Sequence, residues 1–232
     1  MAATEPRVRA VGIRTVRDMR IAIGLVLALV LAGNALADHL DPQKRIRAAD
    51  QARAKSMLLR QSDLPGFQRQ PSSGSDPHLT CPGLDESDLT VTGDAEAPTW
   101  GFSVALVTSS ATVYATRADA ATSWRRGTSA PGMRCLREEF GRQFARQGAR
   151  VVSFRRLAFP ALAQRSAAYR LTLEGTAQGQ TVNAFVDAVV LVQGRALGGL
   201  VVGSAVVEPD RAAEVRLART IAGRMAKAMR RS

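Results

Sequence analysis

The first 37 residues constrain the chain most, because they have the pattern of a segment that directs the remainder across a membrane. Five arginines and no lysine lie in a polar leader, and an uncharged run, 21–37, follows it. The run ends in Ala-Leu-Ala directly before Asp38. A basic region, a short apolar region and small residues at a cleavage site are typical of a secretory signal peptide. We therefore expect 38–232 to fold outside the cytoplasm.

The apolar run could instead remain in the membrane as an uncleaved signal-anchor. Its 17 residues would reach roughly 25 Å as a helix, which is short of the ~30 Å hydrocarbon core. An anchor would keep the leader arginines cytoplasmic, as the positive-inside rule requires. The sequence thus predicts a protein that is secreted or anchored to the outer face of the cytoplasmic membrane. Asn34 stands where a lipoprotein signal carries its cysteine, which excludes lipidation at this site.

The composition of the exported part limits its partners. Without the leader, 195 residues carry a net charge of +9, enough chain for one domain with a sizeable core. A basic balance is compatible with anionic lipid or anionic envelope polymers. Only three of the positive residues are lysines, and an arginine excess of this kind also fits a high-GC codon bias and a solvated surface. Nucleic acid is not an expected partner, since no aromatic-and-basic strip is present.

Two cysteines, Cys81 and Cys135, both lie in the exported part. Exported thiols meet an oxidising compartment, so an even count predicts a disulfide. A reactive thiol would need a base nearby, and His39 and His78 belong to no recognisable catalytic signature. We therefore expect a Cys81–Cys135 bridge.

Periodicity predicts the secondary structure. Leu136, Phe140 and Phe144 repeat every four residues, as expected for one face of a helix. Helices are expected over 44–60, 117–126, 133–147 and 209–229. Apolar alternation predicts strands over 102–107, 112–116, 149–159, 167–174, 180–192 and 196–207.

The order of these elements predicts an α+β fold: a single antiparallel sheet of about six strands, flanked by helices, in one domain over 38–232 with its core at about 45–230. A tight hairpin is expected at Gln193-Gly194-Arg195. Gly198 and Gly199 lie within a predicted strand, where they indicate a bulge or close packing of a helix rather than a phosphate-binding loop.

Residues that could carry catalysis or hold a metal are scarce. The sequence has no Gly-x-Ser-x-Gly elbow. The adjacent acids Glu138 and Glu139 would point about 100° apart on a helix, so they would not converge. The acidic run 85–88 lacks the alternation and glycine of a calcium loop. We expect no enzyme, no metal and no cofactor, with a hydrolase lacking a recognisable motif as a remote alternative.

Three short motifs resemble secreted actinobacterial proteins: Met-Leu-Leu-Arg-Gln-Ser-Asp-Leu-Pro-Gly-Phe at 57–67, Cys-Pro-Gly at 81–83 and Asp-Leu-Thr-Val-Thr-Gly at 88–93. The element order is similar to the PsbP-like fold and to the extracellular sensor domain of mycobacterial PknH-type kinases, over most of 45–230. The resemblance implies an antiparallel sheet with flanking helices, and binding or sensing rather than catalysis. Those sensors carry more than one disulfide, whereas this chain allows one, and any sensory output would need another protein.

Two functional interpretations remain open. The favoured one is an exported, non-enzymatic ligand-binding or sensor-like domain of the cell envelope. A cleft between sheet and helices would hold a small apolar or amphipathic ligand. Its candidate lining residues are Trp100, Trp124, Phe140 and Phe185, although a position in the core is the simpler interpretation of each.

The alternative is an envelope interaction protein whose arginine-rich helices bind anionic polymer or lipid headgroups. Such contacts would be sensitive to salt, because exposed charges are screened within about 8 Å at physiological ionic strength. The arginines expected to form this surface are Arg134, Arg137, Arg142 and Arg146.

Overall fold

A mostly antiparallel sheet forms the middle layer of the molecule. The computed structural model describes residues 40–71, 81–177 and 179–230, so the predicted leader and both histidines lie outside the described residues. Within them the sheet has nine strands, with the main order β1-β3-β5-β9-β8-β7-β6 and with β2 and β4 attached beside β5. The strands are β1 (Gln43–Lys44), β2 (Gln68–Arg69), β3 (Thr90–Glu96), β4 (Trp100–Phe102), β5 (Ala105–Tyr114), β6 (Arg150–Leu157), β7 (Arg165–Ala177), β8 (Gln180–Gln193) and β9 (Ala196–Ala205).

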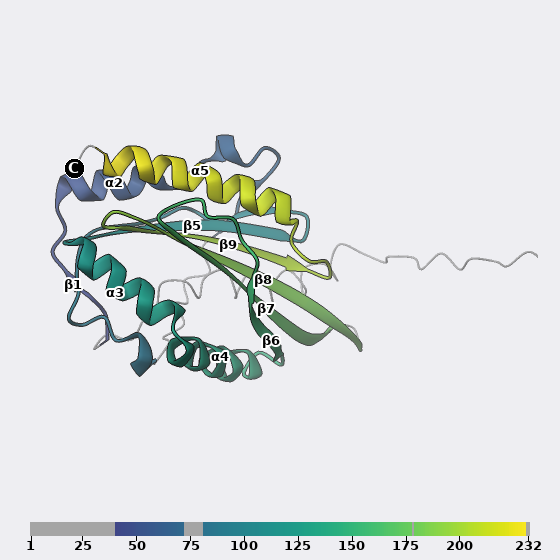
Figure 1. Cartoon of the computed structure of the whole chain (residues 1–232). Helices are drawn as coiled ribbons and strands as arrows, with labels where there is room; N and C mark the ends of the chain where they lie inside the picture. Colours follow the sequence, from purple (N-terminus) through teal and green to yellow (C-terminus); the bar gives the residue numbers. More distant parts are fainter. Residues whose placement is uncertain (1–39, 72–80, 178, 231–232) are drawn as a thin grey trace, which may run out of the picture.

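Helices cover both faces of this sheet. One face carries α2 and α5, which also contact each other, and the other carries α3 and α4 (Figure 1). The helices are α2 (Ala48–Met57), α3 (Arg117–Thr128), α4 (Ala130–Ala145) and α5 (Arg211–Met229), with the short 3-10 turns η2 (Gln61–Asp63) and η3 (Pro82–Leu84). None of the helices in the described part is long and apolar enough to cross a membrane.

The α+β class, the four helices and the antiparallel meander β6-β7-β8-β9 are confirmed, but the strand count was too low. The predicted strands 102–107 and 112–116 are mainly one strand, β5, whose polar centre Ser109 is buried and accepts a hydrogen bond from the Leu59 amide at 2.9 Å. Strand β3 was not predicted, because its sequence is polar and contains Gly93. Helix α5 begins at Arg211 rather than at Pro209, with Asp210 as its N-cap.

The alternation of side chains along each strand divides the core between the two faces. On β8, Val189 and Leu191 join the cluster under α2 and α5, whereas Ala184 and Val186 join the cluster under α4. Almost completely buried side chains from the helices pack on each cluster. These are Met57, Ile221 and Met225 on the face covered by α2 and α5, and Phe144 on the face covered by α4.

Two glycines let helices approach the sheet closely. A Cβ on Gly198 of β9 would lie 2.7 Å from Met225 Sδ and 3.3 Å from Ile221 Cγ2, so this glycine allows close packing of α5. A Cβ on Gly93 of β3 would lie 2.4 Å from the backbone carbonyl atoms of Asp50 in α2. The helix backbone therefore rests directly on the strand at Gly93.

A buried ion pair holds α2 at this position. Arg195, in the β8–β9 hairpin, donates from Nη1 to Asp50 Oδ2 at 2.9 Å and from Nη2 to Asp50 Oδ1 at 2.5 Å. Its Nη1 also donates to the hydroxyl of Thr92 and to the carbonyl oxygen of Tyr114. The hydrogen bonds from Arg195 hold the pKa of the Asp50 carboxyl well below its usual range, against the opposing effect of burial.

The predicted disulfide is present. Cys81, which precedes η3, is bonded to Cys135 of α4, with Cα atoms 5.7 Å apart. The bridge ties α4 to the segment that leads into β3.

Strand β6 is the outermost strand at one end of the described sheet. It pairs with β7 on one side only. Arg150, Arg155 and Arg156 are exposed along it.

Substituting Gly93→Ala should destabilise the fold by about 1–3 kcal/mol, because the added methyl group must displace the α2 backbone. The matched control is Gly141→Ala in α4, where a Cβ meets nothing within 4 Å. That substitution should stabilise by about 0.5–1 kcal/mol, because alanine loses less entropy in a helix. Chemical denaturation of both variants measures the difference, and equal midpoints would contradict this account of α2 docking.

Replacing both Cys81 and Cys135 by serine should lower the free energy of unfolding by about 4 kcal/mol. The estimate is the chain-entropy value for a bridge with a sequence separation of 54. Urea denaturation of the wild type, with and without reductant, should reproduce the shift seen in the double variant. An unchanged midpoint in both experiments would show that the bridge contributes nothing to stability.

Candidate ligand-binding site

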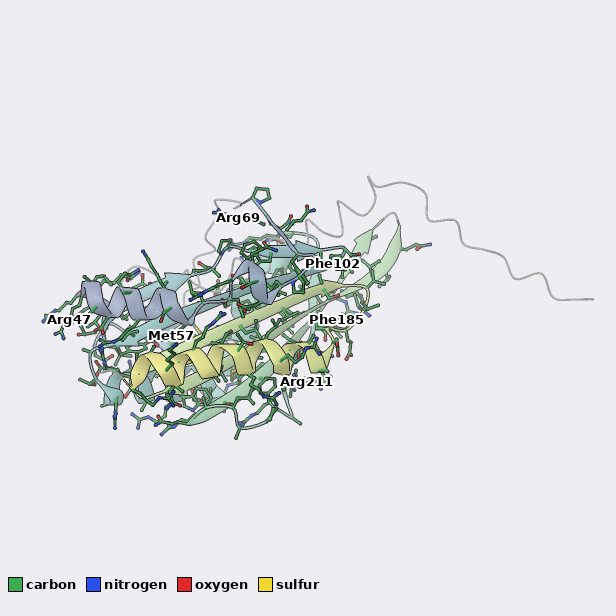
Figure 2. The ribbon with its side chains drawn as sticks, turned by 90° about the horizontal axis from the view of Figure 1, so that it is seen from above. Arg47, Met57, Arg69, Phe102, Phe185 and Arg211 are labelled. Atoms are coloured by element: carbon green, nitrogen blue, oxygen red, sulfur yellow. A yellow bond between two sulfur atoms is a disulfide. The ribbon has the colours of Figure 1, made fainter. Side chains whose placement is uncertain are left out.

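A cavity with a volume of about 740 Å³ lies on the α5 face of the sheet. It is enclosed by the first half of α5, the segment after η2, the turn between β4 and β5, and the chain between β9 and α5. Figure 2 shows Phe102 and Arg211 at the end of the molecule at which α5 begins. We call this cavity the α5 pocket.

The walls of the α5 pocket are mainly apolar. Phe67 and Phe102 pack with ring centroids 5.6 Å apart, and the Phe102 side chain remains 56% exposed. Val107, Val202 and Leu217 line the inner part. An exposed aromatic ring beside a cavity of this kind offers apolar surface to a bound molecule.

Two turns at the rim hold non-glycine residues in left-handed conformations. Ser103, between β4 and β5, has φ of 52°, and Val206, just after β9, has φ of 75°. The Val207 amide donates to the Ala205 carbonyl oxygen at 2.9 Å across Val206, which makes this a γ-turn. Such conformations are costly for non-glycine residues, above all a β-branched one, and they cluster at functional sites. Their presence at one rim therefore marks the α5 pocket as a candidate site.

A buried charge network lies beneath the pocket. Arg170 on β7 donates from Nε and Nη2 to the two carboxylate oxygens of Asp187 on β8, each at 2.6 Å. Its Nη1 donates to Glu208, which lines the pocket. Arg170 is 5% exposed and Asp187 is fully buried, so neither charge is solvated and each needs the other. The hydrogen bonds to Asp187 raise the pKa of Arg170.

Glu214 of α5 lies against this network and lines the floor of the pocket, although it is only 1% exposed. Its Oε2 accepts a hydrogen bond from Arg211 Nη1 at 2.9 Å. Its Oε1 receives no donor from the described residues, and Asp187 is its neighbour. Burial, together with the hydrogen bond to Asp187, raises the pKa of Glu214 to about 8. Burial in this position therefore favours the neutral form of the carboxyl group.

A smaller cavity, of about 160 Å³, lies on the opposite face of the sheet between α4 and strands β6 to β9. Phe140, Phe154 and Tyr169 line it, with the Phe140 and Phe154 rings edge to face at 5.9 Å. Its lining carries no charged side chain. It is too small to take a ligand of the size that the α5 pocket could hold.

The four aromatic residues proposed from the sequence do not come together. Trp100 is buried in the core with its indole Nε1 lacking a partner in the described structure, and Trp124 is half-buried on α3. Phe140 lines the small cavity on the α4 face. Phe185 lies under Arg170, whose Cζ is 5.9 Å from the ring centroid. A ligand-binding role for these four residues stays a prediction.

Sequence reasoning missed the residues that build the α5 pocket. Phe67 and Phe102 were not selected, since each is a single aromatic residue near a turn. Two other signals were available. Glu214 lies at the buried position one helical turn before Ala218, and Asp187 lies between apolar residues of β8. A charge at a position that periodicity assigns to the core is a functional candidate.

The arginines proposed for an anionic surface are all exposed on α4 or at its C-terminal end: Arg134, Arg137, Arg142 and Arg146. Arg142 is paired with Glu139 on the same helix. In α5, Arg224 is half-buried and pairs with Asp63 at 2.8 and 2.9 Å. Binding of anionic polymer or lipid stays a prediction.

The acidic run before β3 has a structural partner. Arg126 of α3 forms two hydrogen bonds with the Asp88 carboxylate, at 2.6 and 2.9 Å. Among the described residues, no group of three or more histidine, cysteine or acidic side chains is arranged to hold a metal ion.

Comparison with known proteins gives one structural likeness. No family model matches the chain, and no curated protein matches it. The crystal structure of the extracellular domain of PknH from Mycobacterium tuberculosis is similar, with a TM-score of 0.44 and 13% identity, over 78% of this chain and 97% of that chain. At this identity and TM-score, the likeness assigns the chain no ligand and no activity.

The charge state of Glu214 should be visible in the pH dependence of stability. Its pKa rises from 4.5 to about 8 on folding, so its neutral form favours the folded state. The contribution is fully present below pH 4.5 and is lost as the pH rises to about 8.

The free energy of unfolding, measured from pH 4.5 to 9 for wild type and for Glu214→Gln, tests this directly. Over that pH interval, the free energy of unfolding of the wild type should fall by up to about 4–5 kcal/mol relative to that of the variant. Parallel curves for the two proteins would show that Glu214 ionises normally.

Proposed function

We propose that this protein is an extracytoplasmic, sensor-like domain that binds a small amphipathic molecule in the α5 pocket. The observation that carries the proposal is a pocket of about 740 Å³ with aromatic and aliphatic walls and a buried polar floor. Small-molecule sites typically have volumes of about 300–1,000 Å³ and mostly apolar walls with a few polar groups that fix orientation.

The polar floor and the apolar walls favour a ligand with two distinct ends. Phe67, Phe102 and Leu217 would contact its apolar part. The polar end would face the acidic side chains that line the pocket, among them Glu208 and Asp210.

The disulfide supports the proposed location. A bridge between Cys81 and Cys135 is stable in an oxidising compartment and is rare in the cytosol. The signal-like sequence at 1–37, which lies outside the described residues, also favours an extracytoplasmic location.

Ala213 and Ala212 offer a matched pair of variants for testing the pocket. Ala213 lines the pocket and is half-buried, whereas its neighbour Ala212 is exposed and lies outside the lining. Ala213→Trp should fill the pocket and weaken binding at least tenfold, while Ala212→Trp should leave it unchanged. The probe is N-phenyl-1-naphthylamine, an uncharged fluorophore whose emission rises in apolar surroundings, titrated into protein secreted by a bacterial host.

The wild type should bind the probe saturably. Absence of saturable binding would contradict the proposed function. Equal affinity of the two tryptophan variants would place the binding elsewhere, provided that thermal melting shows both variants to be folded.

A further inference from the structure

Another cavity, of about 580 Å³, opens between α2 and α5. Figure 2 looks down on these two helices, which lie side by side. None of the eight described residues that line the cavity is acidic, and four are cations: Arg53, Arg60, Arg224 and Lys227. The other four have small side chains: Ala49, Ala52, Ser56 and Ala228. We call this cavity the α2–α5 groove.

Helical periodicity places the lining residues on the facing sides of the two helices. On α2 they recur at i, i+3, i+4 and i+7, and on α5 they recur at i, i+3 and i+4. Because alanine and serine occupy the other positions, the long cationic side chains surround a space that no large apolar side chain fills. The groove therefore concentrates positive charge around a volume that a ligand can enter.

Two of the four cations are held in place by carboxylates that lie outside the lining. Arg53 donates from Nη1 to Asp50 Oδ1 at 2.6 Å. Arg224 donates to both carboxylate oxygens of Asp63, at 2.8 and 2.9 Å, and to the carbonyl oxygen of Leu58 at 2.5 Å. The side chains of Arg53 and Arg224 remain 26% and 22% exposed. Their orientation is thus fixed before a ligand arrives, which lowers the entropic cost of binding.

These carboxylates do not neutralise the groove. Asp50 is shared between two arginines, Arg53 and Arg195, and Asp63 pairs with Arg224. The two remaining cations of the lining are exposed. Five cations and two carboxylates leave a local excess of three positive charges. An anion that enters the groove meets this excess at short range.

The types of cation indicate the class of anion. A guanidinium group presents its N–H donors in a planar fork that matches the oxygens of a phosphate group, and lysine adds a compact point charge. A phosphate monoester or a pyrophosphate carries more than one negative charge, which suits the local excess better than a single carboxylate does. The volume of the groove also exceeds what one phosphate ion fills, so the phosphate would belong to a larger molecule.

We propose that the α2–α5 groove binds a phosphate group carried by a larger molecule, which is either a soluble organic phosphate or the head group of an anionic phospholipid. The site is separate from the α5 pocket, because no residue lines both cavities. Asp63 lines the pocket and its partner Arg224 lines the groove. The inference therefore does not depend on what the pocket binds.

Two probes distinguish the two sources of phosphate. Pyrophosphate is titrated calorimetrically into the secreted protein at low ionic strength. Vesicles of phosphatidylcholine, with and without phosphatidic acid, are tested by co-sedimentation. We expect saturable binding of at least one phosphate probe, weakening as added salt screens the charges. Pyrophosphate binding identifies a soluble ligand, and binding only to vesicles that contain phosphatidic acid identifies a lipid head group. Binding of neither probe would overturn the proposal.

Two double variants locate the binding. Arg60→Gln with Lys227→Gln removes two exposed charges from the groove and should weaken binding about tenfold or more. Arg134→Gln with Arg137→Gln removes the same charge from exposed positions on α4, which covers the opposite face of the sheet, and should leave the affinity within about threefold. An equal loss in both double variants would assign the attraction to the overall charge of the protein and refute a site in the groove.

Ala52 provides a second matched pair, because it is exposed on α2 and lines the groove. Ala52→Glu and Ala52→Gln add side chains of nearly the same size that differ in charge. The glutamate variant should bind the phosphate probe at least tenfold more weakly than the glutamine variant, with thermal melting as the check that both are folded. Equal affinity of the two folded variants would place the anion outside the groove.

Discussion

The contact on which the rest of the structure depends is the one between α2 and the sheet at Gly93. The absence of a side chain there allows the helix backbone at Asp50 to rest on β3. The Asp50 carboxylate then reaches Arg195 in the β8–β9 hairpin. Both charges are largely withdrawn from water, so each stabilises the fold only because the other is present. Helix α2 in turn packs against α5, which forms one wall of the pocket. The position of α5, and with it that of the pocket, therefore depends on Gly93 and on the Asp50–Arg195 ion pair.

The two faces of the sheet are built with different chemistry. Under α4 the core is aromatic and aliphatic, and the disulfide ties this helix to the segment before β3. Under α2 and α5 the core is apolar, and near the start of α5 the buried Arg170–Asp187 ion pair lies beside it. Burying charge in this way is an expensive route to stability compared with packing apolar groups of the same volume. Its placement beside the strained turns at Ser103 and Val206 accords with selection for binding rather than for folding alone.

Much of the fold could be predicted because local pattern and tertiary structure agree. The four-residue repeat of Leu136, Phe140 and Phe144 predicted α4, and alternation predicted the meander of long strands. The disulfide was predicted from the even number of cysteines and from the oxidising compartment to which the chain is expected to be exported. Strand β3 could not be predicted, because Gly93 and Asp94 are selected by the helix that covers them and not by strand propensity. Ser109 and Ser110 interrupt the apolar alternation of β5, so one strand was predicted as two. Ser109 is in this position because its hydroxyl accepts a hydrogen bond from the Leu59 amide.

The pocket was harder to predict than the fold, because segments far apart in the sequence form it. Phe67, Phe102 and Leu217 become neighbours only through the sheet order and the packing of α5. Choosing candidates by aromatic type selected Trp100, which the fold uses in its core. The more informative residues were the acids at buried positions, Asp187 and Glu214, because burying a charge needs a reason that packing does not provide.

The arginines along β6 affect how the molecule behaves at high concentration. An outermost strand offers a row of unpaired amide and carbonyl groups to which a strand of another molecule can add. Arg150 is paired with Glu174 of β7, whereas Arg155 and Arg156 are exposed on the same strand. Two copies that approach edge to edge therefore bring like charges together. An extended sheet with long central strands is thereby protected from growing into fibres, and the protection weakens as salt screens the repulsion.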